Sequence, residues 1–261
     1  MIKVGSLFAG IGGFEKGIED AFDGMAETVW QVEQNSFCQK VLKKHWPNAT
    51  IYDDVRTVGK HNLEPVHILC GGFPCQSISQ AGKMEGLENE NKSGLWWEMH
   101  RIISELRPRI ALLENVANVL SVGGPDVVGS LAEIGYDCEW TVIRASDFGA
   151  PHHRARWFCV AYPSSIRLQK NQTQSIRFQS QGKGIWSNST QCSNVDGNDT
   201  RRNHWQQFPI ESPVCGRNDG VSNRVDRIKA LGNAIVLQCS EWVARQVLNS
   251  GLLDDLTQEM K

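Results

Sequence analysis

Two patterns of apolar residues alternate along the first 162 positions of the chain. Short apolar runs, which are typical of buried strands, alternate with segments whose apolar residues recur every three or four positions, as in amphipathic helices. Local signals mark some boundaries, because Ser36 is placed to cap one helix and Pro108 ends another. The predicted strands are residues 2–8, 28–32, 67–72, 110–113, 138–144 and 156–161, and the predicted helices are residues 14–22, 36–45, 95–106 and 127–134.

Strands that alternate with helices build a mostly parallel sheet with helices on both faces. We therefore predict an α/β fold for residues 1–162. Residues 163–223 show no clear period, and residues 233–248 return to helical spacing. The expected organisation is a large domain at 1–162, a small irregular region at 163–222 and a C-terminal segment at 223–261.

Composition narrows the class of protein. The 261 residues are 40% hydrophobic and 21% charged and include nine Trp, which suits a folded chain with a sizeable core. No run of about 18 apolar residues occurs, and the N-terminus lacks the pattern of a secretory signal. The eight Cys form no C-x-x-C pair. We expect a cytoplasmic protein with reduced thiols, no membrane contact and no metal.

The net charge of -2 conceals an asymmetry along the chain. Residues 163–230 contain ten Lys and Arg but only five Asp and Glu, and they are rich in Asn, Gln and Ser. Such a segment is either a flexible linker, because it can bury little apolar surface, or a surface that contacts a polyanion such as nucleic acid. Composition does not decide between the two.

A glycine-rich turn follows the first predicted strand. Gly10, Gly12 and Gly13 permit a tight turn there and a close approach of the backbone to a ligand. Glu33 lies 20 residues after Gly13, at the end of the next strand, where a carboxylate commonly accepts hydrogen bonds from ribose hydroxyls. The arrangement fits a dinucleotide or S-adenosylmethionine (SAM) equally well, and a plain tight turn is the simpler alternative.

Other reactive groups follow later strands. Cys75 comes after a glycine pair and Pro74, in a turn that opens onto a long polar loop; this setting suits a reactive thiolate, although a lone Cys is more often an inert core residue. Glu114 ends another predicted strand. Arg154 and Arg156 alternate along an extended segment, which would put both on one face as phosphate or base contacts, or as a solvated basic edge.

In this order the motifs resemble those of the DNA cytosine-5 methyltransferase family, especially its short bacteriophage and bacterial members. The counterparts here are Phe-x-Gly-x-Gly-Gly at 8–13, Pro-Cys-Gln at 74–76, Glu-Asn-Val at 114–116, Gln-x-Arg-x-Arg as His152-x-Arg154-x-Arg156, and Gly-Asn-Ala at 232–234. The resemblance covers nearly all of 1–162 and 221–245. It implies a SAM-dependent, Rossmann-like sheet with helices on both faces, plus a small irregular target-recognition region.

The chain departs from the family pattern at three places. His152 replaces the usual Gln, Leu237 stands where many members have Pro, and residues 91–95 lack an Arg that many members carry. None of these changes removes a group that the family's reaction needs. The target-recognition region is also far shorter than is typical.

The resemblance implies a reaction that transfers a methyl group from SAM to carbon 5 of cytosine in double-stranded DNA and releases S-adenosylhomocysteine. Cys75 would add to carbon 6 of the base, and Glu114 would hold its ring nitrogen 3 and exocyclic amine. Arg156 would hold the carbonyl of the base, and Arg154 would support a loop or a phosphate. Because the target carbon is inaccessible in a duplex, the base must flip out, with loop 76–93 as the lid.

The same resemblance implies two sets of binding residues. Those expected to bind SAM are Phe8, Gly10, Gly12, Gly13, Glu33, Asp54, Pro74, Leu95 and Asn233. Those expected to contact DNA are Gln76, Ser79 and Lys83 in the loop, and Arg167, Arg177, Arg201, Arg202 and Arg217 in the recognition region. For Asp54 a solvated turn is the alternative, and the recognition sequence cannot be read from the chain.

Three other functions stay open at this stage: a tRNA cytosine-5 methyltransferase, a catalytically weak relative that only binds DNA, and a nicotinamide-dependent oxidoreductase. The phage-like segment 224–233 argues against the first. The intact Cys75, Glu114 and Arg156 argue against the second, and an oxidoreductase has no use for Pro-Cys-Gln together with Glu-Asn. We expect a monomer that acts beside a restriction endonuclease of the same motif, or that protects phage DNA.

Overall fold

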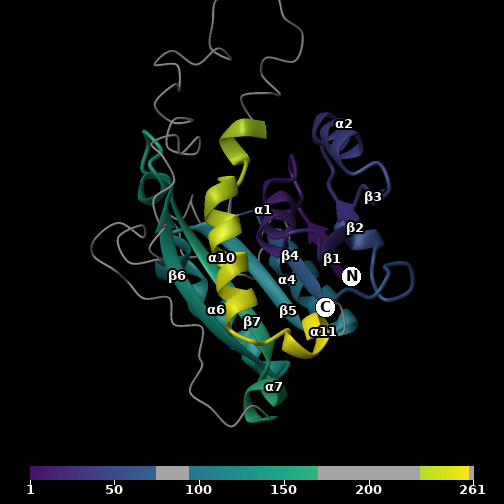
Figure 1. Ribbon diagram of the computed structural model, residues 1–261, viewed down its shortest axis with the longest axis vertical. Coiled ribbons are helices and arrows are strands. Elements are labelled where there is room, and N and C mark those ends of the chain that lie inside the picture. The colour runs from purple at the N-terminus through teal and green to yellow at the C-terminus, as the bar shows by residue number, and fades with distance from the viewer. Residues whose placement is uncertain (75–93, 170–229, 259–261) are drawn as a thin grey trace, which may run out of the picture.

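A seven-stranded sheet forms the centre of the computed structural model, which describes residues 1–74, 94–169 and 230–258 (Figure 1). The strands are β1 Ile2–Leu7, β2 Ala26–Val32, β3 Thr50–Tyr52, β4 Ile68–Gly72, β5 Ile110–Val116, β6 Tyr136–Arg144 and β7 Ala155–Pro163. Their order is β3-β2-β1-β4-β5-β7-β6. Neighbours from β3 to β5 pair in parallel, whereas β7 runs antiparallel to both β5 and β6. The predicted mostly parallel sheet is therefore confirmed.

Helices cover both faces of this sheet. They are α1 Gly13–Phe22, α2 Ser36–His45, α4 Gly94–Leu106, α5 Val119–Val122, α6 Gly124–Glu133, α7 Ser164–Gln169, α10 Leu237–Asn249 and α11 Asp254–Gln258, with short 3-10 helices η1 Val55–Thr57 and η2 Ala145–Phe148. Helices α1 and α10 pack together on one face, and α4 and α6 supply the core of the other (Figure 1). Within the described ranges, no helix is long and apolar enough to cross a membrane.

The central strands are apolar along their whole length because both of their faces are covered. Ile68 and Cys70 of β4 belong to the core beneath α1 and α10, whereas Leu69 between them belongs to the core beneath α4. Leu112 and Leu113 of β5 divide between the two cores in the same way. This division follows from the pleat, which points successive side chains to opposite faces.

The N-terminal cap of α2 differs from the prediction. Asn35, and not Ser36, caps the helix, because its Oδ1 accepts hydrogen bonds from the N–H groups of Phe37 (2.9 Å) and Cys38 (3.1 Å). Asn and Ser cap helices about equally well, so local sequence could not rank two adjacent candidates. Ser36 is the first residue of the helix instead.

Several predicted element boundaries differ from the structure by one or more residues, and two of these differences affect the site. Strand β5 does not stop at residue 113 but continues to Val116, because β7 pairs with its last three residues. Glu114 therefore lies inside the sheet, between Gly72 and Phe158 of the neighbouring strands. Helix α10 begins at Leu237 and not at Asn233, which ends a separate helical stretch at 230–233.

Candidate active site

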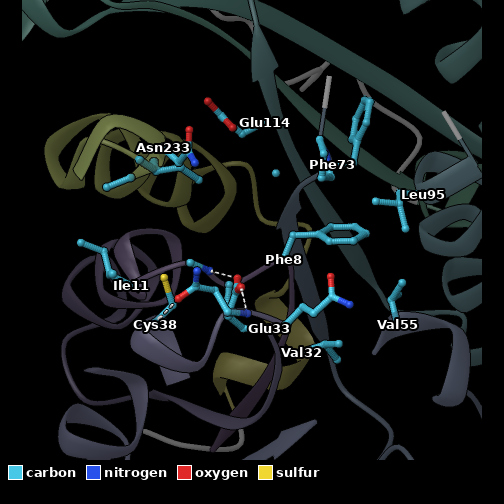
Figure 2. A pocket seen from close by; sticks show the side chains of 18 of the residues that line it. Phe8, Ile11, Val32, Glu33, Cys38, Val55, Phe73, Leu95, Glu114 and Asn233 are labelled. Atoms are coloured by element: carbon cyan, nitrogen blue, oxygen red, sulfur yellow. Dashed lines mark hydrogen bonds between the residues drawn. The ribbon is translucent and has the colours of Figure 1, made fainter. Parts of the chain in front are cut away.

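A cavity of about 460 Å³ opens at the carboxyl ends of β1, β2, β4 and β5 (Figure 2). Ligands bind at this edge in open α/β sheets, and the volume lies in the range of small-molecule sites. The structure brings ten of the thirteen residues predicted for catalysis and SAM binding to its wall: Phe8, Gly10, Gly13, Glu33, Asp54, Pro74, Leu95, Glu114, Arg156 and Asn233. Figure 2 shows Phe8 between Glu33 on one side and Glu114 on the other. The two predicted groups of residues therefore share a single cavity.

The three motif glycines at the start of α1 are needed for three different reasons. Gly10 lines the cavity with a φ of 57°, and a Cβ there would meet nothing within 4 Å. A Cβ on Gly13 would lie 2.6 Å from the carbonyl oxygen of Ile235. Gly12 is not among the residues that line the cavity, because it faces the indole of Trp46 behind the turn. A contact of Gly12 with the cofactor stays a prediction.

Glu33 holds the glycine turn in place. Its Oε2 accepts a hydrogen bond from the N–H of Gly10 (2.8 Å), and its Oε1 accepts one from the N–H of Asn35 (2.7 Å) (Figure 2). Each carboxylate oxygen has a further lone pair. Glu33 can thus fix the turn and still accept hydrogen bonds from a ligand in the cavity.

Asp54 has a local structural role as well as a place in the cavity wall. It caps η1, where its Oδ1 accepts a hydrogen bond from the N–H of Arg56 (2.9 Å). The neighbouring Asp53 accepts a hydrogen bond from Gln39 (2.7 Å). Both carboxylates stabilise the loop, and both residues line the cavity.

Glu114 forms a buried ion pair with Arg156. The carboxyl is only 8% exposed, and its Oε1 lies 3.0 Å from Nε of Arg156. Burial raises the pKa of Glu114 to about 7, while the positive charges of Arg156 and Arg154 act in the opposite direction. At neutral pH this carboxyl can hold or release a proton, as a group that exchanges protons with a ligand must.

The sequence predicts that Arg154 and Arg156 lie on one face of an extended segment, and the structure contradicts this prediction. It precedes β7 and has a φ of 35°, in the left-handed region, so the alternation of side chains begins only after it. Its guanidinium donates to the carbonyl oxygens of Gly232 (2.9 Å) and Ala234 (2.6 Å). Burial and the charge of Arg156 lower the pKa of Arg154. Arg154 thus bonds to the C-terminal wall of the cavity, where residues 234–236 separate the helical stretch 230–233 from α10.

Sequence reasoning assigned no role to two supporting residues. Asn115 is buried and donates from Nδ2 to the carbonyl oxygen of Phe73 (3.2 Å), next to Pro74 in the cavity wall. Ser240 of α10 donates to the carbonyl oxygen of Gly13 (2.9 Å). Asn115 belongs to the Glu-Asn-Val motif that the sequence shows, whereas no local signal marks Ser240.

Several predicted residues lie outside the part of the chain that the structure describes. They are the predicted nucleophile Cys75, the loop residues Gln76, Ser79 and Lys83, and Arg177, Arg201, Arg202 and Arg217. Arg167 lies in α7, but its side chain is also outside the described set. Their roles stay predictions.

The fold and the cavity define a Rossmann-like protein with a cavity beside a glycine turn, at the carboxyl edge of the sheet where ligands bind in such folds. A match to the family described as C-5 cytosine-specific DNA methylase extends over residues 2–217. The chain belongs to this family.

Individual relatives agree with this assignment. The chain is 36% identical over 197 residues to the Type II methyltransferase M.CviJI of Paramecium bursaria Chlorella virus IL3A, a match that covers 73% of this chain and 50% of the relative. It is 33% identical over 176 residues to the Type II methyltransferase M.Bsp6I of Bacillus sp. (strain RFL6), covering 66% and 55% of the two. The chain therefore spans about half the length of the curated relatives it matches.

A solved structure with similar overall extent is that of the Entamoeba histolytica methyltransferase EhMeth. It superimposes with a TM-score of 0.63 over 98% of this chain and 99% of that one, at 16% sequence identity. At this identity the likeness establishes a shared fold.

Proposed function

We propose that the protein is a SAM-dependent DNA methyltransferase that methylates carbon 5 of cytosine. The observation that carries this proposal is the single cavity, which joins the glycine turn and Glu33 to the Glu114–Arg156 pair. A methyl donor and its acceptor must meet in one enclosed site, and this cavity has one group of residues suited to each. Family membership supports the same reaction.

The glycine-turn side of the cavity suits SAM. Gly10 leaves open space where a side chain would otherwise stand, so a ligand can approach the backbone. The N-terminus of α1 follows this turn, and its unpaired N–H groups suit the carboxylate of the methionine part. Glu33 would accept hydrogen bonds from the ribose hydroxyls, and Asp54 from the adenine amine. When bound, SAM supplies a methyl group activated by its sulfonium.

The Glu114 side of the cavity suits a pyrimidine. In its protonated form Glu114 would donate a hydrogen bond to ring nitrogen 3 and accept one from the exocyclic amine, while Arg156 would donate to the ring carbonyl. Pro74 lines the same cavity, so Cys75 directly follows a residue of its wall. We assign Cys75 as the nucleophile.

The covalent step balances as follows. The Cys75 thiolate adds to carbon 6 of the base, and the electron pair of the ring double bond moves to carbon 5. Charge that develops on ring nitrogen 3 and the carbonyl is stabilised by Glu114 and Arg156. Carbon 5 then takes the methyl group and loses its proton to a base, and elimination of the Cys75 thiolate restores the double bond.

We assign Arg154 a positioning role rather than a direct contact with DNA. Both of its terminal nitrogens donate to backbone carbonyls of the C-terminal wall. It would therefore keep residues 233–235 against the cofactor.

The proposed organisation and partners follow from this reaction. Residues 1–162 would carry catalysis, 163–222 would contact double-stranded DNA through their arginines, and 223–261 would return to the catalytic domain. The protein would act as a cytoplasmic monomer. It would act beside a restriction endonuclease of the same motif or protect phage DNA.

The test is to express the protein and its Cys75→Ala variant in methylation-deficient cells and to map 5-methylcytosine at base resolution. Methylation at one short motif in the wild type, and none in the variant, is the expected result. Cys138→Ala is the matched control, since Cys138 lies on β6 outside the cavity wall. It should methylate like the wild type.

Two outcomes would contradict the proposal. Full methylation by Cys75→Ala would show that this thiol is not the nucleophile. A folded wild type that leaves DNA unmethylated but transfers methyl groups to transfer RNA would replace the DNA assignment with an RNA one.

A further inference from the structure

The indole of Trp46 occupies the place where a side chain on Gly12 would stand. A Cβ built on Gly12 would lie only 2.2 Å from Cζ3 and 2.4 Å from Cη2 of this ring. Gly12 has a φ of 88° and precedes the first residue of α1, so the ring rests against the backbone of the glycine turn. Trp46 itself comes directly after α2, more than 30 positions along the chain.

Glu19 of α1 fixes the orientation of that ring. The indole Nε1–H of Trp46 donates to both carboxylate oxygens of Glu19, at 2.8 and 3.0 Å. The Oε1 of Glu19 also accepts hydrogen bonds from the N–H (3.0 Å) and the hydroxyl (2.6 Å) of Thr28 on β2. Hydrogen bonds to a charged acceptor are about twice as strong as neutral ones. One carboxylate thereby connects α1, β2 and the end of α2.

The glycine turn is thus fixed from two sides. On the cavity side, Glu33 accepts the N–H of Gly10; on the opposite side, Trp46 packs against Gly12. Neither Glu19 nor Trp46 is among the residues that line the cavity, so their packing would act on a ligand indirectly, and the backbone between Gly10 and Gly12 is one route for this effect.

We propose that Glu19 and Trp46 are positioning residues for SAM. The carboxylate of Glu19 orients the indole, and the indole fixes the position of the glycine-turn backbone, so that the backbone of Gly10 can contact the cofactor. This inference rests on the proposed function. It adds a pair of residues outside the cavity that determine the affinity for SAM. In this proposal the glycine turn contacts the cofactor and lies away from the part of the cavity that would hold the pyrimidine. DNA binding and the chemical step should therefore be unaffected.

The experiment compares Trp46→Phe, Trp46→Ala and Glu19→Gln with the wild-type protein. We expect Trp46→Phe and Glu19→Gln each to raise the KM for SAM, and the Kd for S-adenosylhomocysteine measured by calorimetry, on the order of tenfold. Trp46→Ala, which also removes the ring, should raise both further. The kcat and the KM for DNA should stay within about twofold of wild type, which is the signature of lost uniform binding.

A double variant tests whether Trp46 and Glu19 act through one shared contact or affect SAM binding independently. Trp46→Phe and Glu19→Gln both weaken the same indole–carboxylate contact, so the combined variant should bind S-adenosylhomocysteine about as weakly as either single variant. Multiplied effects in the double variant would contradict a shared positioning contact.

Trp30→Phe is the matched control. Its indole N–H donates to the carbonyl oxygen of Glu64 (2.9 Å), and the ring is 1% exposed and packs against Gly5 instead of the glycine turn. We expect Trp30→Phe to lower the melting temperature while leaving the KM for SAM unchanged. If the Trp46 and Glu19 variants likewise lose only stability, the inference is wrong. If the wild type itself fails to bind S-adenosylhomocysteine, the proposed function fails first.

Discussion

At the scale of single residues, burial and neighbouring charges act in opposite directions on the pKa of Glu114. Glu114 experiences the charges of two guanidiniums, which would normally keep a carboxyl ionised, yet its burial in the sheet raises its pKa to about 7. Arg156 pairs with this carboxyl, and Arg154 uses its donors on the backbone of another segment. Two arginines separated by one residue therefore have different tasks.

The first prediction concerns the proton on Glu114. If the protonated carboxyl binds the base, kcat/KM should decline as the pH rises through about 7, because the carboxyl then loses its proton. Glu114→Gln should lower the rate of methyl transfer by about 10²-fold or more, since an amide cannot pass a proton to the ring, and its remaining activity should lack this decline. Steady-state rates between pH 6 and 9 check both points. A pH profile shared by Glu114→Gln and the wild type would assign the titration to another group.

The second prediction concerns Arg154. Arg154→Lys should raise the KM for SAM about tenfold, because a single ammonium cannot bridge the carbonyls of Gly232 and Ala234 as the planar guanidinium does. Arg109→Lys is the control, since Arg109 also donates to a C-terminal carbonyl, that of Leu252 (2.7 Å), but is not a residue of the cavity wall. Equal KM values for both variants would argue against the positioning role.

At the scale of elements, the contact between α1 and α10 holds the C-terminal segment against the glycine turn. The two helices approach so closely that a Cβ on Gly17 would lie 2.1 Å from Oγ of Ser240 and 2.7 Å from the backbone nitrogen of Glu241. The same hydroxyl donates to the carbonyl oxygen of Gly13. This packing places Ile235 at the cavity, more than 200 positions after the turn that it completes.

The third prediction compares two helical glycines. Gly17→Ala should lower the free energy of unfolding by about 1–3 kcal/mol, because the new methyl group meets backbone as well as side chain. Gly129→Ala in α6 should instead raise it by about 0.5–1 kcal/mol, since its methyl group would meet nothing within 4 Å and alanine favours the helix. Chemical denaturation of both variants provides the comparison. Equal destabilisation by the two changes would show that helix packing does not discriminate between these sites.

At the scale of the whole molecule, a titratable group inside the core makes stability depend on pH. Glu15 of α1 is completely buried, and its Oε1 accepts a hydrogen bond from Nε2 of Gln31 on β2 (3.1 Å). Burial raises the pKa of Glu15 from 4.5 to about 7. The folded protein therefore keeps this proton over a range in which the unfolded chain has already released it.

The fourth prediction follows from that difference. As the pH rises from about 4.5 to about 7, only the unfolded chain gains from releasing the proton, so Glu15 should lower the free energy of unfolding by up to about 3 kcal/mol. Glu114, whose pKa is also raised to about 7, should contribute a similar fall over the same range. Glu15→Gln should therefore remove about half of the total slope, because the amide stays neutral. Glu133→Gln, which removes an exposed carboxylate from α6, is the control and should leave the slope unchanged. Denaturation at several pH values decides, and an unaltered slope in Glu15→Gln would contradict the prediction.

Much of this architecture could be predicted because its signals are local. The pattern of apolar runs and helical spacing identified six of the seven strands of the described sheet and five helices, since burial on both sides of a sheet leaves a pattern in the sequence itself. The glycine turn, Glu33 and Glu114 could be recognised because each lies near the carboxyl end of a predicted strand. The antiparallel edge formed by β6 and β7 could not be recognised, since strand direction depends on partners far along the chain.

The sequence by itself determined the α/β class, the carboxyl-edge location of the candidate site and the family. Only the tertiary structure decided that Arg154 holds the C-terminal wall and that Gly12 faces Trp46 instead of the cavity. It also decided that burial outweighs two guanidiniums at Glu114. The physical reason is the same in each case: a pattern of neighbours sets local conformation, whereas contacts, burial and electrostatic balance arise between residues that only folding brings together.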